Sequence, residues 1–562
     1  SNHIAVIVSG LGLAATAIYG DDPENPSLEP YLSGILAKMK DFMDKTYFPE
    51  GSYGEPYTYQ AMASRDLTET LCALERNFGI DYTSTTDLKD LYIYPLYATH
   101  SNGRYQDFGD VSLWYGRTQT HFQWLAYKMK NPWTYAYVKP FWDSGRGGFT
   151  GYLWYTDGIT PRYRDELPTS KLFADKGNMI MRSDWKDDGS IMIFKCGPNS
   201  NHYHLDQGTF VIMTNGQELL SDAGHSDGYY SNLYYPCYYT QAIGHNVMLV
   251  DKNPESQGIA DYENGVAALR DYPQITRHFA SDIADNVEGD LTTVYKGVLS
   301  AYTRSLLYMK PDILYVFDKV NSDNGHEYNW LFHAEHSDGK NAITFKDNRV
   351  TIIRSKANLT MDVIAPRIAS HTIRDSDRDE SYIMLSSEIG QTGTAFLAVL
   401  SPSAGTNPTS ITSTLIEGDG WIGARSELKS TVAVGMFSLD GREKGLNADG
   451  IHADAERCAV VMDNKGRIER YIIRGKRLAV QDNSKIIFLS DEPVSAAAAY
   501  DEKKVVMEID KAKASAEKLA VLFQPTDVTI NGSSSDDWTY DKAKQLLEIQ
   551  LPEGHSTCII KK

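Results

Sequence analysis

The segment from Gly197 to Phe210 holds the densest group of side chains that could do chemistry. Its sequence, GPNSNHYHLDQGTF, places His202, His204 and Asp206 at alternate positions. In an extended chain alternate side chains point to the same face, and three metal-competent groups on one face are costly to bury without a ligand. The segment therefore predicts a metal site or a catalytic site, with a solvated loop as the alternative.

Two further polar residues follow this segment. Asp222 lies in the sequence LLSDAG and His245 in GHN. Two histidines and a carboxylate form a ligand set that suits zinc or a similar divalent ion. The Asn-Gly pair at 215–216, between two apolar runs, predicts a hairpin. A regular two-residue turn would pair Asp222 with Thr209, so His204 would need a bulge or a bend to reach it.

Two other patterns resemble catalytic motifs. GHSDG at 224–228 matches the G-x-S-x-G of serine hydrolases, but that motif lies between a strand and a helix, and the tyrosine-rich sequence after it has no helical period. His333 and His336 lack the H-E-x-x-H spacing, so we interpret them as core or loop histidines. The sequence contains neither a P-loop nor a dinucleotide-binding fingerprint.

The composition is that of an acidic globular protein. Among 562 residues, 55 are Lys or Arg and 74 are Asp or Glu, which gives a net charge of −19. This charge argues against nonspecific binding to nucleic acid or to an anionic membrane. Five widely separated cysteines argue against a disulfide scaffold. The 36 tyrosines and 9 tryptophans suit sugar stacking, but they equally suit sheet packing.

The hydrophobic period changes near residue 178. Before it, apolar residues recur at helical spacing, in 31–43, 67–78, 120–129 and 133–142. The apolar run 4–18 is too short for a membrane span, and we interpret it as a buried helix. A glycine-rich stretch at 144–151 predicts a linker.

From Asn178 onward the period is two, which is typical of strands. The alanine-rich segment 491–501 predicts a boundary between a large β region and a smaller terminal one. Helices first and strands afterwards indicate an α+β protein with segregated layers. The predicted strands cover 179–182, 191–196, 209–213, 247–250, 313–317 and 395–400.

Several segments, taken in chain order, resemble the heparinase II/III-like polysaccharide lyases. They are Ser1-Asn2-His3 with the run GLGLAA, the stretch 55–60, FADKG followed by MRS, the segments around His202, Asp222 and His245, and the stretch 308–318. The resemblance spans roughly residues 1 to 340, and the ordered set is far more specific than any single piece.

The resemblance implies an architecture and a set of site residues. Residues 1–150 would form an incomplete α/α toroid, residues 165–490 a large antiparallel β-sandwich, and residues 491–562 a smaller β region. Upstream helices outside this sequence, or a second chain, would complete the toroid. The catalytic group would be Asn2, His3, Tyr59 and His202, and one divalent ion, expected to be zinc, would be bound by His204, Asp222 and His245.

The resemblance also implies a reaction, the β-elimination of a uronic-acid-containing polysaccharide of the alginate or glycosaminoglycan type, in the periplasm or outside the cell. Asn2 and His202 would neutralise the substrate carboxylate, while Tyr59 and His3 would move protons. Two alternatives stay open. One is a glycan hydrolase whose metal ion activates water, and the other is a non-catalytic glycan-binding protein.

Overall fold

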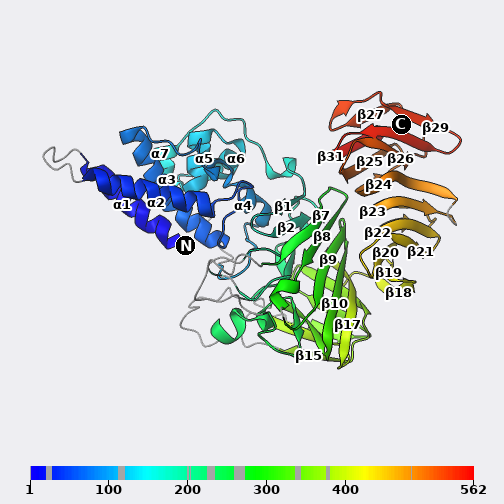
Figure 1. The fold of residues 1–562 in the computed structure, drawn as a ribbon. Coiled ribbons are helices and arrows are strands. Elements are labelled where there is room, and N and C mark those ends of the chain that lie inside the picture. The colour runs from blue at the N-terminus through cyan, green and yellow to red at the C-terminus, as the bar shows by residue number, and fades with distance from the viewer. Residues whose placement is uncertain are drawn as a thin grey trace.

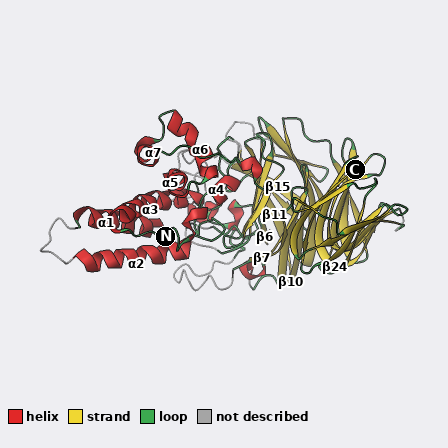
Figure 2. Ribbon diagram, turned by 90° about the horizontal axis from the view of Figure 1, so that it is seen from above, coloured by secondary structure: helices red, strands yellow, loops and turns green. Residues whose placement is uncertain are grey.

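The computed structural model describes residues 2–19, 28–100, 102–111, 120–198, 202, 204–223, 235–257, 272–295, 297–335, 343–374, 380–481 and 484–562. Figures 1 and 2 show helices at the amino-terminal end, a group of sheets in the middle, and a long sheet that carries the carboxyl terminus. The predicted α+β class, with helices before antiparallel strands, is confirmed.

Capping residues mark the end of α3 and the start of α6. Gly79 follows α3 with a φ of 69° and donates its N–H to the Glu75 carbonyl, which is a left-handed helix cap. Asn131 precedes α6, and its side chain accepts hydrogen bonds from the first N–H groups of that helix. The helices are α1 (Asn2–Ile18), α2 (Leu28–Thr46), α3 (Tyr57–Phe78), α4 (Ile93–Ala98), α5 (Thr120–Met129), α6 (Pro132–Asp143) and α7 (Gly148–Trp154).

Helix α1 is buried along one side only. Val8 and Ala15 share a core with α2 and α3, whereas Ile7, Leu11 and Ile18 are 60%, 52% and 50% exposed. The prediction of a helix is confirmed, but the prediction that it is buried is wrong for its far side, which no described element covers. None of the described helices is long and apolar enough to cross a membrane.

A five-stranded antiparallel sheet joins the helices to the rest of the molecule. Asn215 and Gly216, with φ of 49° and 70°, form the predicted turn, and Thr214 pairs with Gln217 beside it. A register shift between Met213 and Ile212 then sets Ile212 opposite Leu220. In order, the strands are β1 (Ser170–Phe173), β2 (Asn178–Arg182), β3 (Ser190–Lys195), β4 (Phe210–Thr214) and β5 (Gln217–Leu220).

The helical part covers one face of this sheet. Ile180, Ile193 and Val211 of the sheet share a core with Tyr57 of α3 and Tyr94 of α4. The opposite face packs into the central core, so these strands are apolar at nearly every position. This contact holds the start of α3 and the loop that follows α4 against the segment that carries His202.

Two more sheets form the sandwich of the middle part. One has eight strands, in the order β12 (Ile343–Lys346), β13 (Arg349–Ile353), β14 (Ala357–Ala365), β17 (Gln391–Ala404), β10 (Ile313–His326), β9 (Ala301–Met309), β8 (Ala284–Asp290) and β7 (Gln274–Phe279). The other has four, in the order β15 (Ser370–Arg374), β16 (Glu380–Ser386), β11 (Tyr328–Glu335) and β6 (Met248–Val250).

Alternation along β10 shows how the eight-stranded sheet is buried on both faces. Leu314 and Val316 enter the core shared with the five- and four-stranded sheets. Tyr315 and Phe317 point the other way, into a core shared with the long sheet. Successive strand side chains point to opposite faces, so one strand contributes to two cores.

The long sheet has fourteen strands and begins at Thr412. Its main path is β18 (Thr412–Gly418), β19 (Trp421–Glu427), β20 (Thr431–Ser438), β22 (Ile451–Asp463), β23 (Ile468–Val480), β24 (Lys485–Tyr500), β25 (Lys504–Lys511), β31 (Gly554–Lys561), β27 (Asp527–Ile530) and β28 (Ser533–Ser534). Off this path lie β21 (Lys444–Ala448), β26 (Ser515–Ala520), β29 (Trp538–Asp541) and β30 (Leu546–Leu551).

Two predicted connections are in fact regular elements. The alanine-rich boundary at 490/491 falls inside β24, where Ala496 and Ala498 enter one core and Ala497 another. Small side chains there let the strand pack closely on both faces, so the alanine run is a buried strand of the long sheet. The glycine-rich linker at 144–151 likewise contains the start of α7.

A buried ion pair connects the eight-stranded sheet to the long sheet. Arg457 of β22 contacts the Glu288 carboxylate of β8, which also accepts a hydrogen bond from Ser305 Oγ at 2.8 Å. Burial alone would raise the pKa of this carboxyl group, but the Arg457 guanidinium outweighs burial and holds the pKa of Glu288 at about 2, against a usual 4.5.

We expect Glu288→Gln to lower stability at neutral pH and to flatten its dependence on acid. A carboxyl group with a depressed pKa stabilises the fold above its unfolded value, and that contribution is lost as the pH falls through the folded value. Between about pH 6 and pH 2 the parent should lose ~3 kcal/mol more than the variant in urea unfolding. The exposed Glu427→Gln should behave as the parent does, and an unchanged acid dependence in Glu288→Gln would contradict this assignment.

Candidate active site

The start of α3 is fixed by a carboxylate from the loop after α4. Asp107 accepts hydrogen bonds from the Tyr57 N–H at 2.8 Å and from the Tyr94 hydroxyl at 2.9 Å. A negative charge at this position stabilises the free N–H groups and the dipole of a helix start. From the sheet side, Lys176 donates to the carbonyls of Tyr53 and Glu55, at 3.2 and 3.0 Å, and its ammonium lies 3.7 Å from Asp107.

Tyr59 lies in the first turn of α3 and packs face to face on His202. The ring centroids are 3.7 Å apart and the planes differ by 9°. Side chains two residues apart on a helix point in nearly opposite directions, so Tyr57 faces elsewhere, with its ring 4.2 Å from that of Tyr105. The structure therefore brings two predicted catalytic residues together from parts of the chain far apart in sequence.

His202 is held in an unusual backbone conformation. Its φ is 65°, in a region that non-glycine residues seldom adopt. Its carbonyl accepts a hydrogen bond from the Asp110 N–H at 3.2 Å. Gly109, with a φ of 83°, allows this approach, because a Cβ there would lie 2.3 Å from the His202 oxygen. His202 and residues 204–208 are not part of a strand, so the alternation of an extended chain does not describe them.

Asp110 connects the two predicted groups, and the sequence analysis did not identify it. Its carboxylate lies 3.0 Å from His202 Nδ1, 3.0 Å from His204 Nε2 and 3.1 Å from the Tyr235 hydroxyl. Burial would raise the pKa of Asp110, but these hydrogen bonds outweigh it and lower the pKa to about 2. Asp206, in contrast, accepts two hydrogen bonds from Lys195 Nζ, at 2.7 and 2.8 Å.

The three predicted metal ligands come together in the interior. His204, Asp222 and His245 are buried, and one ligand atom from each lies within 4.8 Å of the others. His245 Nδ1 lies 2.9 Å from Asp222 Oδ1. In the described part of the chain, His204 Nδ1 and His245 Nε2 are buried nitrogens with no hydrogen-bond partner. Such atoms are costly unless a ligand satisfies them, so this donor set fits a bound divalent cation.

The two histidines differ in their electrostatic environment. Burial lowers the pKa of His204 and favours the neutral imidazole that a metal ion requires. For His245, the Asp222 carboxylate outweighs burial and raises the pKa. Asp222 therefore favours a positive charge beside it, either a proton on His245 or a cation.

Asn2 and His3 lie at the start of α1. The Asn2 N–H donates to Glu55 Oε2 at 3.2 Å, and the Asn2 side chain is buried, whereas His3 is exposed. Glu55 lies in the segment that leads into α3, so this contact connects the start of α1 to the segment that precedes Tyr59.

The two weaker motifs have different outcomes. His333 is a buried core histidine, with Nδ1 3.2 Å from Asn246 Oδ1 and Nε2 3.0 Å from the Ile243 carbonyl, as predicted. Its neighbour in the motif, His336, and the GHSDG sequence at 224–228 lie outside the described residues.

Comparisons with known proteins agree with this architecture. Residues 165–434 match the family model described as heparinase II/III-like, C-terminal. No curated protein has a sequence that matches this chain significantly.

Solved structures of lyases share the fold. Heparinase III is 16% identical with a TM-score of 0.60, over 78% of this chain and 67% of that one. A mutant heparan sulfate lyase HepC from Pedobacter heparinus is 14% identical with a TM-score of 0.56, over 77% of this chain and 64% of that one. The Streptomyces coelicolor A3 chondroitin AC lyase, in complex with chondroitin sulphate, is 9% identical with a TM-score of 0.51, over 95% of this chain and 74% of that one.

This chain thus spans slightly less than two thirds of the HepC structure. At these identities the structural likeness establishes the fold, and the family model identifies the matched region. Residues 165–434 of the chain are thus a heparinase II/III-like, C-terminal region.

Proposed function

We propose that this protein is a polysaccharide lyase that cleaves a uronic-acid-containing polysaccharide by β-elimination. The observation that carries the proposal is the stacking of Tyr59 on His202 at 3.7 Å, with His202 joined through Asp110 to a candidate metal site. A phenol and an imidazole side by side can share the proton transfers of an elimination. The lyases of similar fold support the same reaction class.

The reaction requires that a weakly acidic C5 proton be removed next to a carboxylate. In our proposal His202 and Asn2 donate hydrogen bonds to that carboxylate and stabilise the enolate as it forms. Tyr59 takes the proton or delivers one to the leaving oxygen, and His3 serves as its partner on the opposite ring face.

The proposed ion is zinc, held by His204, Asp222 and His245, which match its preference for nitrogen and carboxylate ligands. A bound zinc ion supplies positive charge that fixes its ligands in place. His204 is two residues from His202, so fixing the first orients the second. The full burial of all three ligands favours this structural role over the hydrolase alternative, which needs an open position for water.

The proposed substrate is an anionic uronate polymer, either alginate-like or glycosaminoglycan-like. The family resemblance also favours a location in the periplasm or outside the cell, where such polymers are met. The net charge of −19 requires that substrate be attracted by locally placed cationic groups rather than by the protein as a whole.

A panel of uronans followed by ultraviolet absorbance tests the proposal. Elimination creates a conjugated double bond, so a cleaved substrate should gain absorbance as its reducing ends increase. New reducing ends without absorbance would indicate hydrolysis and overturn the lyase assignment. Binding to the same polymers without any cleavage would support the non-catalytic alternative.

Asp110→Asn should lower turnover about 10- to 100-fold, because the Asp110 carboxylate positions His202 and orients His204, a proposed ligand of the ion. The loss should fall mainly in kcat, with weaker metal retention, and both are measured by steady-state kinetics and metal analysis. Tyr235→Phe, which removes one hydrogen bond to the same carboxylate, is the matched control and should change turnover only a few-fold. Parent-like kcat and metal content in Asp110→Asn would remove its positioning role.

A further inference from the structure

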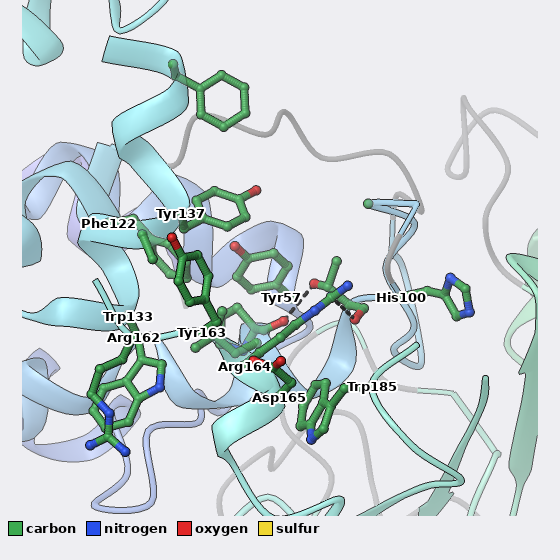
Figure 3. A pocket seen from close by; sticks show the side chains of 16 residues that line it. Tyr57, His100, Phe122, Trp133, Tyr137, Arg162, Tyr163, Arg164, Asp165 and Trp185 are labelled. Atoms are coloured by element: carbon green, nitrogen blue, oxygen red, sulfur yellow. Dashed lines mark hydrogen bonds between the residues drawn. The ribbon is translucent and has the colours of Figure 1, made fainter. Parts of the chain in front are cut away.

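A pocket lies among residues of the helical part, the segment 162–165 and Trp185. Its volume is about 490 Å³, within the range of roughly 300–1,000 Å³ found for small-molecule sites. Figure 3 shows the side chains of Tyr57, Tyr137, Arg164 and Trp185 facing this space. Seven of the sixteen lining residues are Phe, Tyr or Trp, and two of the three charged ones are arginines.

The pocket is separate from the candidate active site. Its described lining contains none of the four proposed catalytic residues. Tyr57 lines the pocket from the first turn of α3, while Tyr59 points to the other side of that turn and packs on His202.

Arg164 lines this pocket, and Arg182, which is not among the lining residues, donates to the same carbonyl oxygen as Arg164 does. Arg164 donates to the Thr99 carbonyl at 3.3 Å, and Arg182 donates to the same carbonyl at 2.6 Å. They lie 5.9 and 4.3 Å from the ring centroid of Trp185. Within the described ranges, neither has a carboxylate at ion-pair distance. Burial lowers the pKa of both, that of Arg182 to about 9 with Arg164 adding repulsion.

The carboxylates of Asp187 and Asp165 offset the burial of Arg164 only in part, because its pKa stays lowered. Arg162 is paired with Glu166 at 2.9 Å and lies over the Trp133 ring. Burial lowers the pKa of His100 to about 4, so it is neutral at pH 7. Asp165 is exposed at the rim. A partly desolvated cation with no carboxylate at ion-pair distance is costly, and an anion bound at Arg164 would relieve that cost.

We propose that this pocket binds the ring of an acidic sugar, with its carboxylate or sulfate on the Arg164 guanidinium and its ring against the aromatic walls. Guanidinium groups bind such oxyanions through paired hydrogen bonds, and flat aromatic side chains pack against sugar rings with little loss of conformational entropy. The choice of a sugar rests on the proposed function. The site would hold a unit of the polymer away from the bond that is cleaved.

Calorimetric titration with monosaccharides tests the inference. Glucuronate and N-acetylglucosamine 6-sulfate are the acidic probes, and they distinguish carboxylate from sulfate recognition; glucose is the neutral probe. At least one acidic probe should bind the parent about 10-fold or more tighter than glucose does. Arg164→Gln should weaken that binding about 10- to 100-fold. Arg162→Gln, in the same segment but already paired, should change it less than about 3-fold.

Tyr59→Phe should leave this binding unchanged, since Tyr59 does not line the pocket. If glucose bound the parent as tightly as both acidic probes do, that result alone would overturn the inference. Parent-like binding by Arg164→Gln, or loss of binding in Tyr59→Phe, would also overturn it. Arg164-dependent binding without cleavage of any uronan would contradict only the proposed function, whereas cleavage without such binding would contradict only this inference.

Discussion

Tyr59→Phe should keep the fold and lose about 10²–10⁴-fold in turnover of any uronan that the parent cleaves. The substitution keeps the ring, and with it the stacking on His202 at 3.7 Å, but removes the hydroxyl that would carry the proton. Removing a hydroxyl from a half-buried ring should change stability by less than ~1 kcal/mol. Initial rates by absorbance, together with a thermal melt of the same sample, measure both effects.

Tyr57→Phe is the matched control, because Tyr57 is the same residue type in the same helical turn. Its ring is buried against Tyr105 and lines the separate pocket, so its loss of a hydroxyl should change turnover only a few-fold. If Tyr57→Phe abolished turnover while Tyr59→Phe did not, the catalytic assignment would be wrong by two residues. If neither change mattered, the proposed mechanism would be wrong.

His204→Ala should reduce the metal content of protein purified without chelator from about one ion per chain to near zero. His204 Nδ1 is a buried nitrogen beside Asp222 and His245, and its removal leaves two of the three ligands. Turnover should fall with the ion, since the segment that carries His202 loses its anchor. Elemental analysis and kinetics on the same preparation test both statements.

His121→Ala is the control for the loss of a buried histidine. His121 lies in α5 of the helical part and is fully buried, so its loss should cost stability but not metal. Full metal content in His204→Ala would remove this residue from the site. A chelator that strips the ion without changing turnover or the melting temperature would show that the ion does not hold the active site.

The elements that sequence reasoning located well are those with a strong local signal. Helical periodicity located α2, α5 and α6, and the Asn-Gly turn located the β4–β5 hairpin. The predicted metal ligands His204, Asp222 and His245 came from the resemblance to heparinase II/III-like lyases, and the fold places their side chains together. The division of the β part was not found, since Ala496 to Ala499 read as a linker while their small side chains in fact pack into two cores.

Asp110 could not be found in this way, because its role depends on tertiary contact. It lies 92 residues from His202 in a loop without periodicity, and only the folded chain brings the two together. The one local signal is Gly109 before it, at a turn where a positive φ lets the backbone approach His202 closely. Many surface loops contain Gly-Asp, so that signal is weak by itself.

The proposed active site is complete only when α3 is packed correctly against the five-stranded sheet. Tyr59 comes from one side of this contact and His202 from the other, and Lys176 and Asp107 hold the two sides together. Each part could regain its own helices or strands and still present only half of the catalytic group. A lesion at Lys176, which lies outside the proposed catalytic group, would therefore look like a catalytic defect in an assay, although every catalytic side chain was intact.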